Sequence, residues 1–137
     1  MTVHATCVAW DGRGVLITGK SGAGKSGLAL ILMGLGCGLV ADDRVTLSAT
    51  DGDVIATCPP ALQGLIEARG IGILNAAATG PVPLALVVDL DQQELERMPP
   101  RRSITLSGCA LPLIHGQENA HFAAAILQLL KAGWSHE

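Results

Sequence analysis

The apolar positions of the chain fall into short runs, which glycine, proline and charged residues separate. Residues 13–18 form one such run, which leads directly into glycines and is typical of a buried strand. Residues 26–33 predict a helix, because glycines at 34, 36 and 38 mark its end. Residues 84–88 predict a second buried strand. Since strands and helices interleave along the chain, the pattern indicates an α/β fold. We expect its sheet to be mostly antiparallel to mixed.

Two further runs predict a hairpin. Residues 44–48 and 54–57 are strand-like and flank Asp51-Gly52, a dipeptide that favours tight two-residue turns. Residues 61–68 are expected to form one or two helical turns. Shorter strand-like runs, interrupted by glycine or proline, occur at 70–74, 104–106 and 111–114.

Residues 120–132 form the clearest amphipathic helix. Phe122, Ile126, Leu129 and Leu130 recur at the spacing that places side chains on one core-facing stripe. We find no internal repeat and no domain boundary. The sequence therefore predicts a single domain over residues 1–137.

Composition narrows the class of protein. The chain has 137 residues and a mass of 14.0 kDa, and its 49% hydrophobic and 15% charged residues exclude a disordered chain. Its mean hydropathy of +0.43 raises the question of a membrane span. The longest apolar runs, 28–33 and 84–88, are far shorter than the ~18–20 residues that a spanning helix needs. Residues 1–10 lack the basic region of a secretory signal, so we predict neither a membrane span nor a leader.

Charge and cysteine usage point to a cytoplasmic protein that does not bind nucleic acid. Nine basic and twelve acidic residues give a net charge of −3, and aromatic residues, which would stack on bases, make up 2%. The four cysteines are widely spaced and form no CxxC pair. This pattern predicts buried thiols in a reducing compartment rather than a disulfide framework or a zinc site.

Residues 19–26 match the phosphate-binding motif G-x-x-x-x-G-K-[ST] in full, between a predicted strand and a predicted helix. Glycines let backbone N–H groups converge on phosphate oxygens, and the helix N-terminus adds a favourable dipole. Lys25 would neutralise the β- and γ-phosphates, and the Ser26 hydroxyl would coordinate Mg²⁺. The predicted cofactor-binding loop therefore consists of Gly19, Lys20, Ser21, Gly22, Ala23, Gly24, Lys25 and Ser26.

Two acidic segments compete for the role of the magnesium-linked acid. Asp89 follows the apolar run 84–88, which is the usual pattern in P-loop enzymes. Asp42 and Asp43 follow a shorter apolar run at 39–41. Adjacent residues of a strand face opposite ways, so these two carboxylates are expected to have different roles. The residues alone leave this choice open.

Four segments, in this order, resemble the catalytic domain of the HPr kinase/phosphorylase family. His4 lies at the place of the family's H-[AG]-x segment, and residues 19–26 resemble its phosphate-binding loop. Residues 39–45 read Leu-Val-Ala-Asp-Asp-Arg-Val, which is similar to a family signature. Residues 66–73 include Glu-Ala-Arg-Gly-Ile-Gly-Ile, which is similar to another. Both signatures are more specific than the loop.

The resemblance implies a P-loop kinase domain with a fold like that of phosphoenolpyruvate carboxykinase. It implies Mg²⁺-dependent transfer of phosphate from ATP, or in some members pyrophosphate, to a serine of HPr, the small phosphocarrier of the sugar phosphotransferase system. Many members also reverse the reaction by phosphorolysis. A homo-hexamer is implied as well. The chain resembles a short form of the family that lacks its additional N-terminal domain.

Residue roles follow from the same resemblance. Lys25 is expected to contact the β- and γ-phosphates, and Ser26 and Glu67 are expected to hold Mg²⁺. Asp43 is expected to take the proton of the incoming seryl hydroxyl, while Asp42 supports it beside the phosphates. These roles favour the pair at 42–43 over the later aspartate as the acidic part of the site.

Further positions match the family's site motifs. His4 is expected near the transferred phosphate, and Arg69 and Gly70 belong to the signature loop around the bound nucleotide. Arg97 matches an active-site arginine. The chain departs from the family at residues 113–119, where many members have an arginine-rich segment tied to dephosphorylation. This departure argues against phosphorolysis.

Two other functions compete with an HPr-directed kinase. One is another P-loop NTPase or small-molecule kinase, in which Asp89 is the magnesium-linked acid. The other is a non-catalytic module that binds ATP and a phosphocarrier without transferring phosphate. The presence of Lys25, Ser26, Asp43 and Glu67 together favours the enzyme over the sensing module.

Overall fold

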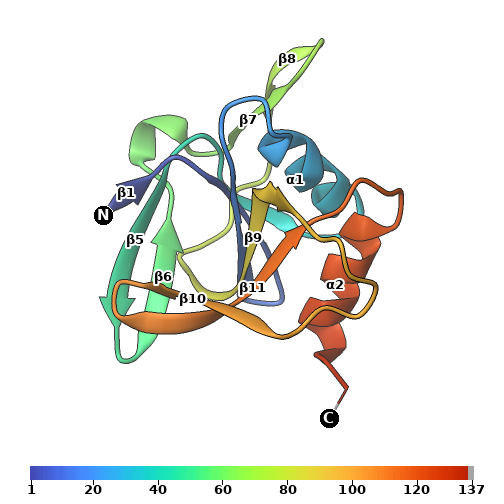
Figure 1. Cartoon of the computed structure of the whole chain (residues 1–137). Helices are drawn as coiled ribbons and strands as arrows, with labels where there is room; N and C mark the ends of the chain where they lie inside the picture. The colour runs from blue at the N-terminus through green and yellow to red at the C-terminus, as the bar shows by residue number, and fades with distance from the viewer. Residues whose placement is uncertain (136–137) are drawn as a thin grey trace.

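The computed structural model describes residues 1–135 and contains a nine-stranded mixed sheet, two helices and a separate hairpin (Figure 1). In chain order the elements are β1 (Thr2–Val3), β2 (Thr6–Trp10), β3 (Arg13–Thr18), α1 (Lys25–Gly34), β4 (Gly38–Ala41), β5 (Val45–Thr50), β6 (Asp53–Thr57), the 3-10 turn η1 (Pro60–Leu62), β7 (Leu65–Ala68), β8 (Gly72–Asn75), β9 (Val82–Gln93), β10 (Arg102–Leu106), β11 (Cys109–Gly116) and α2 (Phe122–Ala132). The interleaved order confirms the predicted α/β class.

β9 is the central strand of the large sheet. It runs parallel to β3 on one side and to β11 on the other, and the remaining pairs of the sheet are antiparallel. Because β3, β9 and β11 are parallel, their carboxyl ends meet at one edge of the sheet. The segments that follow these three strands therefore begin close together, and the glycine-rich loop is one of them.

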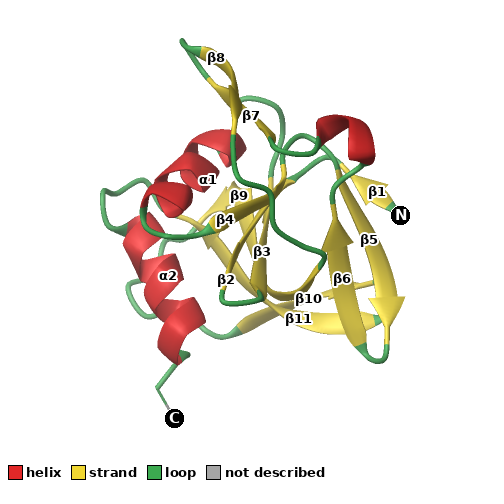
Figure 2. Ribbon diagram, turned by 180° about the vertical axis from the view of Figure 1, so that it is seen from behind, coloured by secondary structure: helices red, strands yellow, loops and turns green. Residues whose placement is uncertain are grey.

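Strand alternation divides the core into two layers. Val15 and Ile17 of β3 pack under the helices with Leu32 of α1 and Ile126 of α2, whereas Leu16 faces the opposite layer. Both helices lie against the same face of the sheet (Figure 2). The second layer is closed by the strands β5 and β6. The sheet is thus covered on both faces, which explains why its central strands have continuous apolar runs.

Three hairpins have two-residue turns with a left-handed backbone. The turns are Asp11-Gly12, Asp51-Gly52 and Ser107-Gly108, and all six residues have positive φ. Such turns match the right-handed twist of the flanking strands. The turn predicted at Asp51-Gly52 is confirmed, and it joins β5 and β6 as expected.

The prediction of helical turns over 61–68 is wrong for most of its length. Only Pro60–Leu62 forms a short 3-10 turn, and Leu65–Ala68 is the strand β7, which pairs with β8. Gly64 has a φ of +73°, which ends the turn, and burial then alternates along β7 with the period of a strand. The β7–β8 hairpin projects from the body beside the N-terminal end of α1 (Figures 1 and 2).

Most other predicted elements are confirmed with shifted ends. The helices occupy Lys25–Gly34 and Phe122–Ala132, and the strand predicted over 84–88 extends over Val82–Gln93. The predicted burial of thiols holds for Cys7 and Cys37, and burial raises the pKa of the Cys7 thiol. Among residues 1–135, no helix has both the length and the apolar character needed to cross a membrane.

Candidate functional site

The glycine-rich loop joins β3 to α1, as the sequence predicts. Gly22 and Gly24 have φ values of +87° and +99°, a region that residues with side chains rarely adopt. Gly24 directly precedes α1, and the N–H of Ala23 donates to the Lys20 carbonyl at 3.0 Å. The loop is therefore a tight turn that aims backbone N–H groups and a helix N-terminus at one point.

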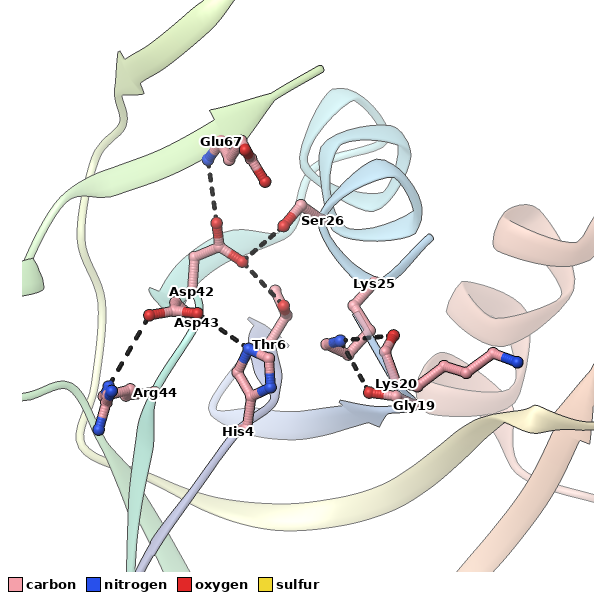
Figure 3. A network of polar contacts seen from close by, with 10 residues as sticks. All are labelled: His4, Thr6, Gly19, Lys20, Lys25, Ser26, Asp42, Asp43, Arg44 and Glu67. Carbon is pink, nitrogen blue, oxygen red and sulfur yellow. Dashed lines mark hydrogen bonds and ion pairs between the residues drawn. The ribbon is translucent and has the colours of Figure 1, made fainter. Parts of the chain in front are cut away.

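The ammonium of Lys25 lies inside this loop. Its Nζ atom donates to the Gly19 carbonyl at 2.7 Å and to the Lys20 carbonyl at 3.1 Å (Figure 3). Lys25 is only 8% exposed. A buried cation needs hydrogen-bond acceptors, and here two carbonyls of the loop supply them. The positive charge is thus held within the turn that would receive a phosphate.

Asp42 connects three segments of the site. Its Oδ1 atom accepts hydrogen bonds from Ser26 Oγ at 2.7 Å and from Thr6 Oγ1 at 2.8 Å, and its Oδ2 accepts from the Glu67 N–H at 2.9 Å (Figure 3). Asp42 and Thr6 are both buried. Three donors satisfy the carboxylate, which makes its burial tolerable and fixes its orientation toward the loop serine.

Asp43 has a different environment, as the sequence predicts, although for another reason than strand alternation. Both aspartates lie beyond the end of β4. Asp43 has a φ of +71°, and the Arg44 N–H donates to the Asp42 carbonyl at 2.8 Å, which defines a three-residue turn centred on Asp43. This turn directs the Asp43 side chain outward, where it is 58% exposed.

Two cationic or ionisable neighbours flank the Asp43 carboxylate. His4 Nε2 lies 2.9 Å from its Oδ1, and Arg44 Nε lies 3.8 Å from its Oδ2. His4 comes from the link between β1 and β2, so the pairing joins the N-terminus of the chain to the turn after β4 (Figure 3). The contact orients one carboxylate oxygen and leaves the group open to a reactant from solvent.

These groups surround one pocket of about 590 Å³, a volume within the usual range for small-molecule sites. Predicted site residues in its lining are His4, Ser21, Gly22, Gly24, Lys25, Ser26, Asp42, Asp43, Glu67 and Arg69. The sequence did not predict the part played by Thr6 or by the apolar wall of Leu30, Leu62, Leu65, Ile66 and Ile73. One wall of the pocket is thus formed by the β7–β8 hairpin.

Four predicted loop residues lie outside this lining. Gly19, Lys20 and Ala23 form the base of the loop, and the Lys20 side chain points away from the pocket (Figure 3). Gly70 has a φ of +88° at the turn of the β7–β8 hairpin. Gly70 therefore serves the backbone conformation of the hairpin, because the turn needs a residue in the left-handed region at this position.

The structure does not bring Arg97 to this pocket, which corrects its predicted place. β9 continues to Gln93, and the segment that follows passes beside the N-terminal end of α2. Arg97 lines a second cavity, whose lining also includes Arg101 and Trp134. The strand predicted to end at 88 continues to Gln93, whereas the place of Arg97 was expected from the family resemblance alone.

Asp89, the other candidate for the magnesium-linked acid, is also absent from the lining of the pocket. Its Oδ1 atom accepts the Asp91 N–H at 2.9 Å, within the extended β9. Asp91 in turn accepts from the Lys20 N–H. The geometry favours Asp42, which contacts the loop serine directly.

The residues present suit a magnesium ion. The Ser26 hydroxyl and the carboxylates of Asp42 and Glu67 line the same pocket, and all are oxygen donors, which Mg²⁺ prefers. Among residues 1–135, no group of three or more His, Cys, Asp or Glu side chains is arranged to hold a metal. Magnesium usually needs only one or two carboxylates, because substrate phosphates and water complete its shell.

Fold and site together define a mixed α/β domain in which a glycine-rich loop faces a buried and an exposed carboxylate. A family model, HPr Serine kinase C-terminal domain, matches residues 1–81, which is more than half of the chain. The chain belongs to the HPr serine kinase C-terminal domain family. This membership confirms the resemblance that the sequence signatures indicated.

Individual relatives agree with this family. The chain is 44% identical over 124 residues to the HPr kinase/phosphorylase of Bordetella pertussis, covering 82% of the chain and 40% of that relative. It is 39% identical over 123 residues to the HPr kinase/phosphorylase of Burkholderia lata, covering 82% of the chain and 38% of that relative. The chain thus spans about 40% of the length of these curated relatives. A solved structure, the Hpr(Ser) kinase/phosphatase from Coxiella burnetii, matches with a TM-score of 0.80 and 29% identity over 96% of this chain and 94% of that one.

Proposed function

We propose that the protein transfers the γ-phosphoryl group of Mg²⁺-bound ATP to a seryl hydroxyl of HPr or an HPr-like phosphocarrier protein. One observation carries the proposal: the two adjacent aspartates have divided roles. Asp42 is buried against the loop serine, and Asp43 is exposed at the same pocket. A module that binds a nucleotide without transferring phosphate has no need of the second, exposed carboxylate.

Asp43 is the proposed general base. A seryl hydroxyl is a weak nucleophile until a base accepts its proton, and the exposed Asp43 carboxylate is accessible to an incoming protein side chain. His4 holds Oδ1 of Asp43, and the proposed proton acceptor is Oδ2, which lies 3.8 Å from Arg44 Nε. As the bond from the serine oxygen to the γ-phosphorus forms, the bond to the β–γ bridging oxygen breaks, ADP leaves, and the proton remains on Asp43.

The other residues bind and orient the donor. Lys25 and the loop N–H groups neutralise the phosphate charge, which is the main demand of phosphoryl transfer. Ser26 and Glu67 would hold Mg²⁺, with Asp42 fixing the serine hydroxyl. A magnesium ion held by these residues would supply positive charge that offsets the charge developing during the transfer. These residues contact the phosphates of the donor, and ATP is the donor that we propose.

The remaining expectations rest on the family alone. We propose a cytoplasmic location and a homo-hexamer on that basis. Reverse phosphorolysis is not part of the proposal, because residues 113–119 contain no arginine. A different P-loop enzyme that uses Asp89 is less well supported, since Asp89 bonds to its own strand and not to the loop serine.

The test uses the intact mass of the phosphocarrier from the same organism after incubation with the protein and Mg-ATP. The expected result is a gain of one acid-stable phosphate. Asp43→Asn should slow the transfer by about 10²–10⁴-fold while nucleotide binding persists. Asp53→Asn removes an exposed aspartate outside the pocket and should transfer at the wild-type rate.

Two results would contradict the proposal. One is that the wild-type protein binds nucleotide and the carrier gains no mass. The other is that Asp89→Asn abolishes the transfer and Asp43→Asn leaves it intact, which would point to the rival P-loop enzyme.

A further inference from the structure

Asp91 holds the glycine-rich loop from outside the pocket. Both of its carboxylate oxygens accept the Lys20 N–H, at 3.0 and 3.1 Å. Asp91 lies near the carboxyl end of β9, and the loop leaves the neighbouring parallel strand β3. The contact therefore joins the start of the loop to the central strand of the sheet. Asp91 lies outside the four segments of the sequence that resemble the family.

The peptide unit between Gly19 and Lys20 connects Asp91 to Lys25. Its N–H donates to the Asp91 carboxylate, and its carbonyl accepts the Lys25 ammonium at 2.7 Å. A carboxylate, a peptide and an ammonium thus form one hydrogen-bonded chain. Each bond in such a chain polarises the next, so the carboxylate strengthens the carbonyl as an acceptor for the cation.

Close packing limits other arrangements of this peptide. A Cβ atom added at Gly19 would lie 3.0 Å from the Ala23 Cβ and 3.3 Å from the Leu90 Cβ. The peptide therefore sits against the end of β9 with little room to move. Asp89 adds to the order, because its Oδ1 accepts the N–H of Asp91 at 2.9 Å and fixes the backbone from which the Asp91 side chain extends.

We infer that Asp91 is a positioning residue, which fixes the Gly19–Lys20 peptide and through it the Lys25 ammonium for binding of a polyphosphate. The inference rests on the phosphate-binding part of the proposed function and not on the identity of the acceptor. In this arrangement Asp89 orients the part of β9 that carries Asp91 and does not bind a metal.

A purely structural role would show a different energetic pattern. Asp91 is exposed, and exposed polar contacts add little to the free energy of unfolding. Its effect on ligand affinity should be larger, since a hydrogen bond to a charged group, once lost, changes binding by roughly 10- to 100-fold. Ligand affinity and thermal stability therefore separate the two roles.

The experiment measures binding of inorganic pyrophosphate with Mg²⁺ by calorimetry to the wild-type protein and three variants. Asp91→Ala should weaken binding by about tenfold or more. Asp91→Asn keeps one acceptor oxygen and should lie between the two. The control Asp53→Asn removes an equal charge outside the loop and should bind as the wild type does. The melting temperatures of all four proteins should agree within about 3 °C.

Two further measurements test the route through Lys25. The Lys20 amide resonance should shift in Asp91→Ala and Asp91→Asn and stay in place in Asp53→Asn. In a Lys25→Met background, Asp91→Ala should have less than a twofold further effect on pyrophosphate affinity, because the group it acts through is gone.

An unchanged pyrophosphate affinity in Asp91→Ala would overturn the inference, as would a full additional loss in the Lys25→Met background. Absence of pyrophosphate binding by the wild-type protein would overturn it together with the phosphate-binding part of the proposed function. Sensitivity of binding to Asp91 in a protein that never phosphorylates the carrier would support this inference and contradict only the kinase.

Discussion

Asp43 shows how a single backbone angle assigns a role to a residue. Its left-handed conformation and the tight turn around it separate two neighbouring carboxylates, one buried and one exposed. Sequence reasoning expected the separation from strand alternation, but both residues lie beyond β4. Aspartate tolerates positive φ better than most residues, so the side chain and the turn are compatible.

Thr6 is a fully buried residue of the site that the sequence did not predict. Its hydroxyl donates to Asp42 at 2.8 Å, and Thr6→Val keeps the shape of the side chain while it removes that donor. We expect the free energy of unfolding to fall by about 1.5–3 kcal/mol, the usual value for a hydrogen bond to a charged group. Urea unfolding measures this loss.

Thr2→Val is the matched control for that change. Thr2 is exposed, and its hydroxyl lies 3.5 Å from that of Thr46, so its loss should cost less than about 0.5 kcal/mol. Equal losses in both variants would show that the hydroxyl of Thr6 does not hold Asp42.

At the scale of elements, the strength of the local pattern decided which predictions succeeded. The long apolar runs predicted β3, β9 and α1, and the amphipathic stretch predicted α2, because burial dictates the sequences of these elements. β1 and β2 were missed, although Asp11-Gly12 after β2 is as clear a turn signal as Asp51-Gly52. The error over 61–68 arose because β7 is short and, within residues 1–135, pairs with β8 alone.

Arg13 of the β2–β3 hairpin contacts the C-terminal end of α2. Arg13 Nη1 donates to the Leu130 carbonyl at 2.6 Å, and its guanidinium lies 5.7 Å from the Trp10 ring. The last carbonyls of a helix have no partner within the helix, so Arg13 satisfies one of them. Arg13→Ala should lower the free energy of unfolding by about 1 kcal/mol.

Hydrogen exchange locates that effect. Amides in the last turn of α2 should exchange faster in Arg13→Ala, and those of α1 should not change. Arg13→Lys keeps the cation beside Trp10 and should recover part of the loss. Unchanged exchange in α2 would mean that the Arg13 contact does not stabilise the helix end.

The site as a whole was predictable only in part from the residues. The glycine-rich loop carries its own signature, so Lys25 and Ser26 needed no other information. His4 and Glu67 come from distant segments, and only the family resemblance pointed to them. Asp91 had no signal at all, because its contact depends on the parallel pairing of β3 and β9.

Acid stability of the whole molecule should depend on Glu94. Burial alone would raise its pKa, but hydrogen bonds from Arg102 and the Glu96 N–H, together with the charges of Arg102 and His115, lower the pKa below its ordinary value of 4.5. A carboxyl group whose pKa is lowered by folding stabilises the fold at pH values above its ordinary pKa. This stabilisation is lost as the pH falls through the folded-state pKa. Glu94→Gln should therefore be less stable than the wild type at pH 7.

Urea unfolding at pH 7 and at pH 3 checks this dependence. The difference between wild type and Glu94→Gln should shrink at pH 3, which lies below the ordinary pKa of 4.5. Glu96→Gln, an exposed neighbour, should show no such change. A difference that stays constant with pH would contradict the role of the Glu94 charge.

The hydrogen bonds of Asp42 have a consequence for folding. Its partners Thr6, Ser26 and Glu67 are 36, 16 and 25 residues away in the chain, so the site exists only once β2, α1 and β7 have all assembled. A ligand that binds this assembled state alone stabilises it by mass action, by about 2.7 kcal/mol at a hundred times its Kd. Local opening of the projecting hairpin breaks the bond from Glu67 to Asp42, and a bound ligand therefore suppresses that opening. Ligand binding at the glycine-rich loop should therefore increase the protection of amides in the β7–β8 hairpin against hydrogen exchange, although the two segments are far apart in the sequence.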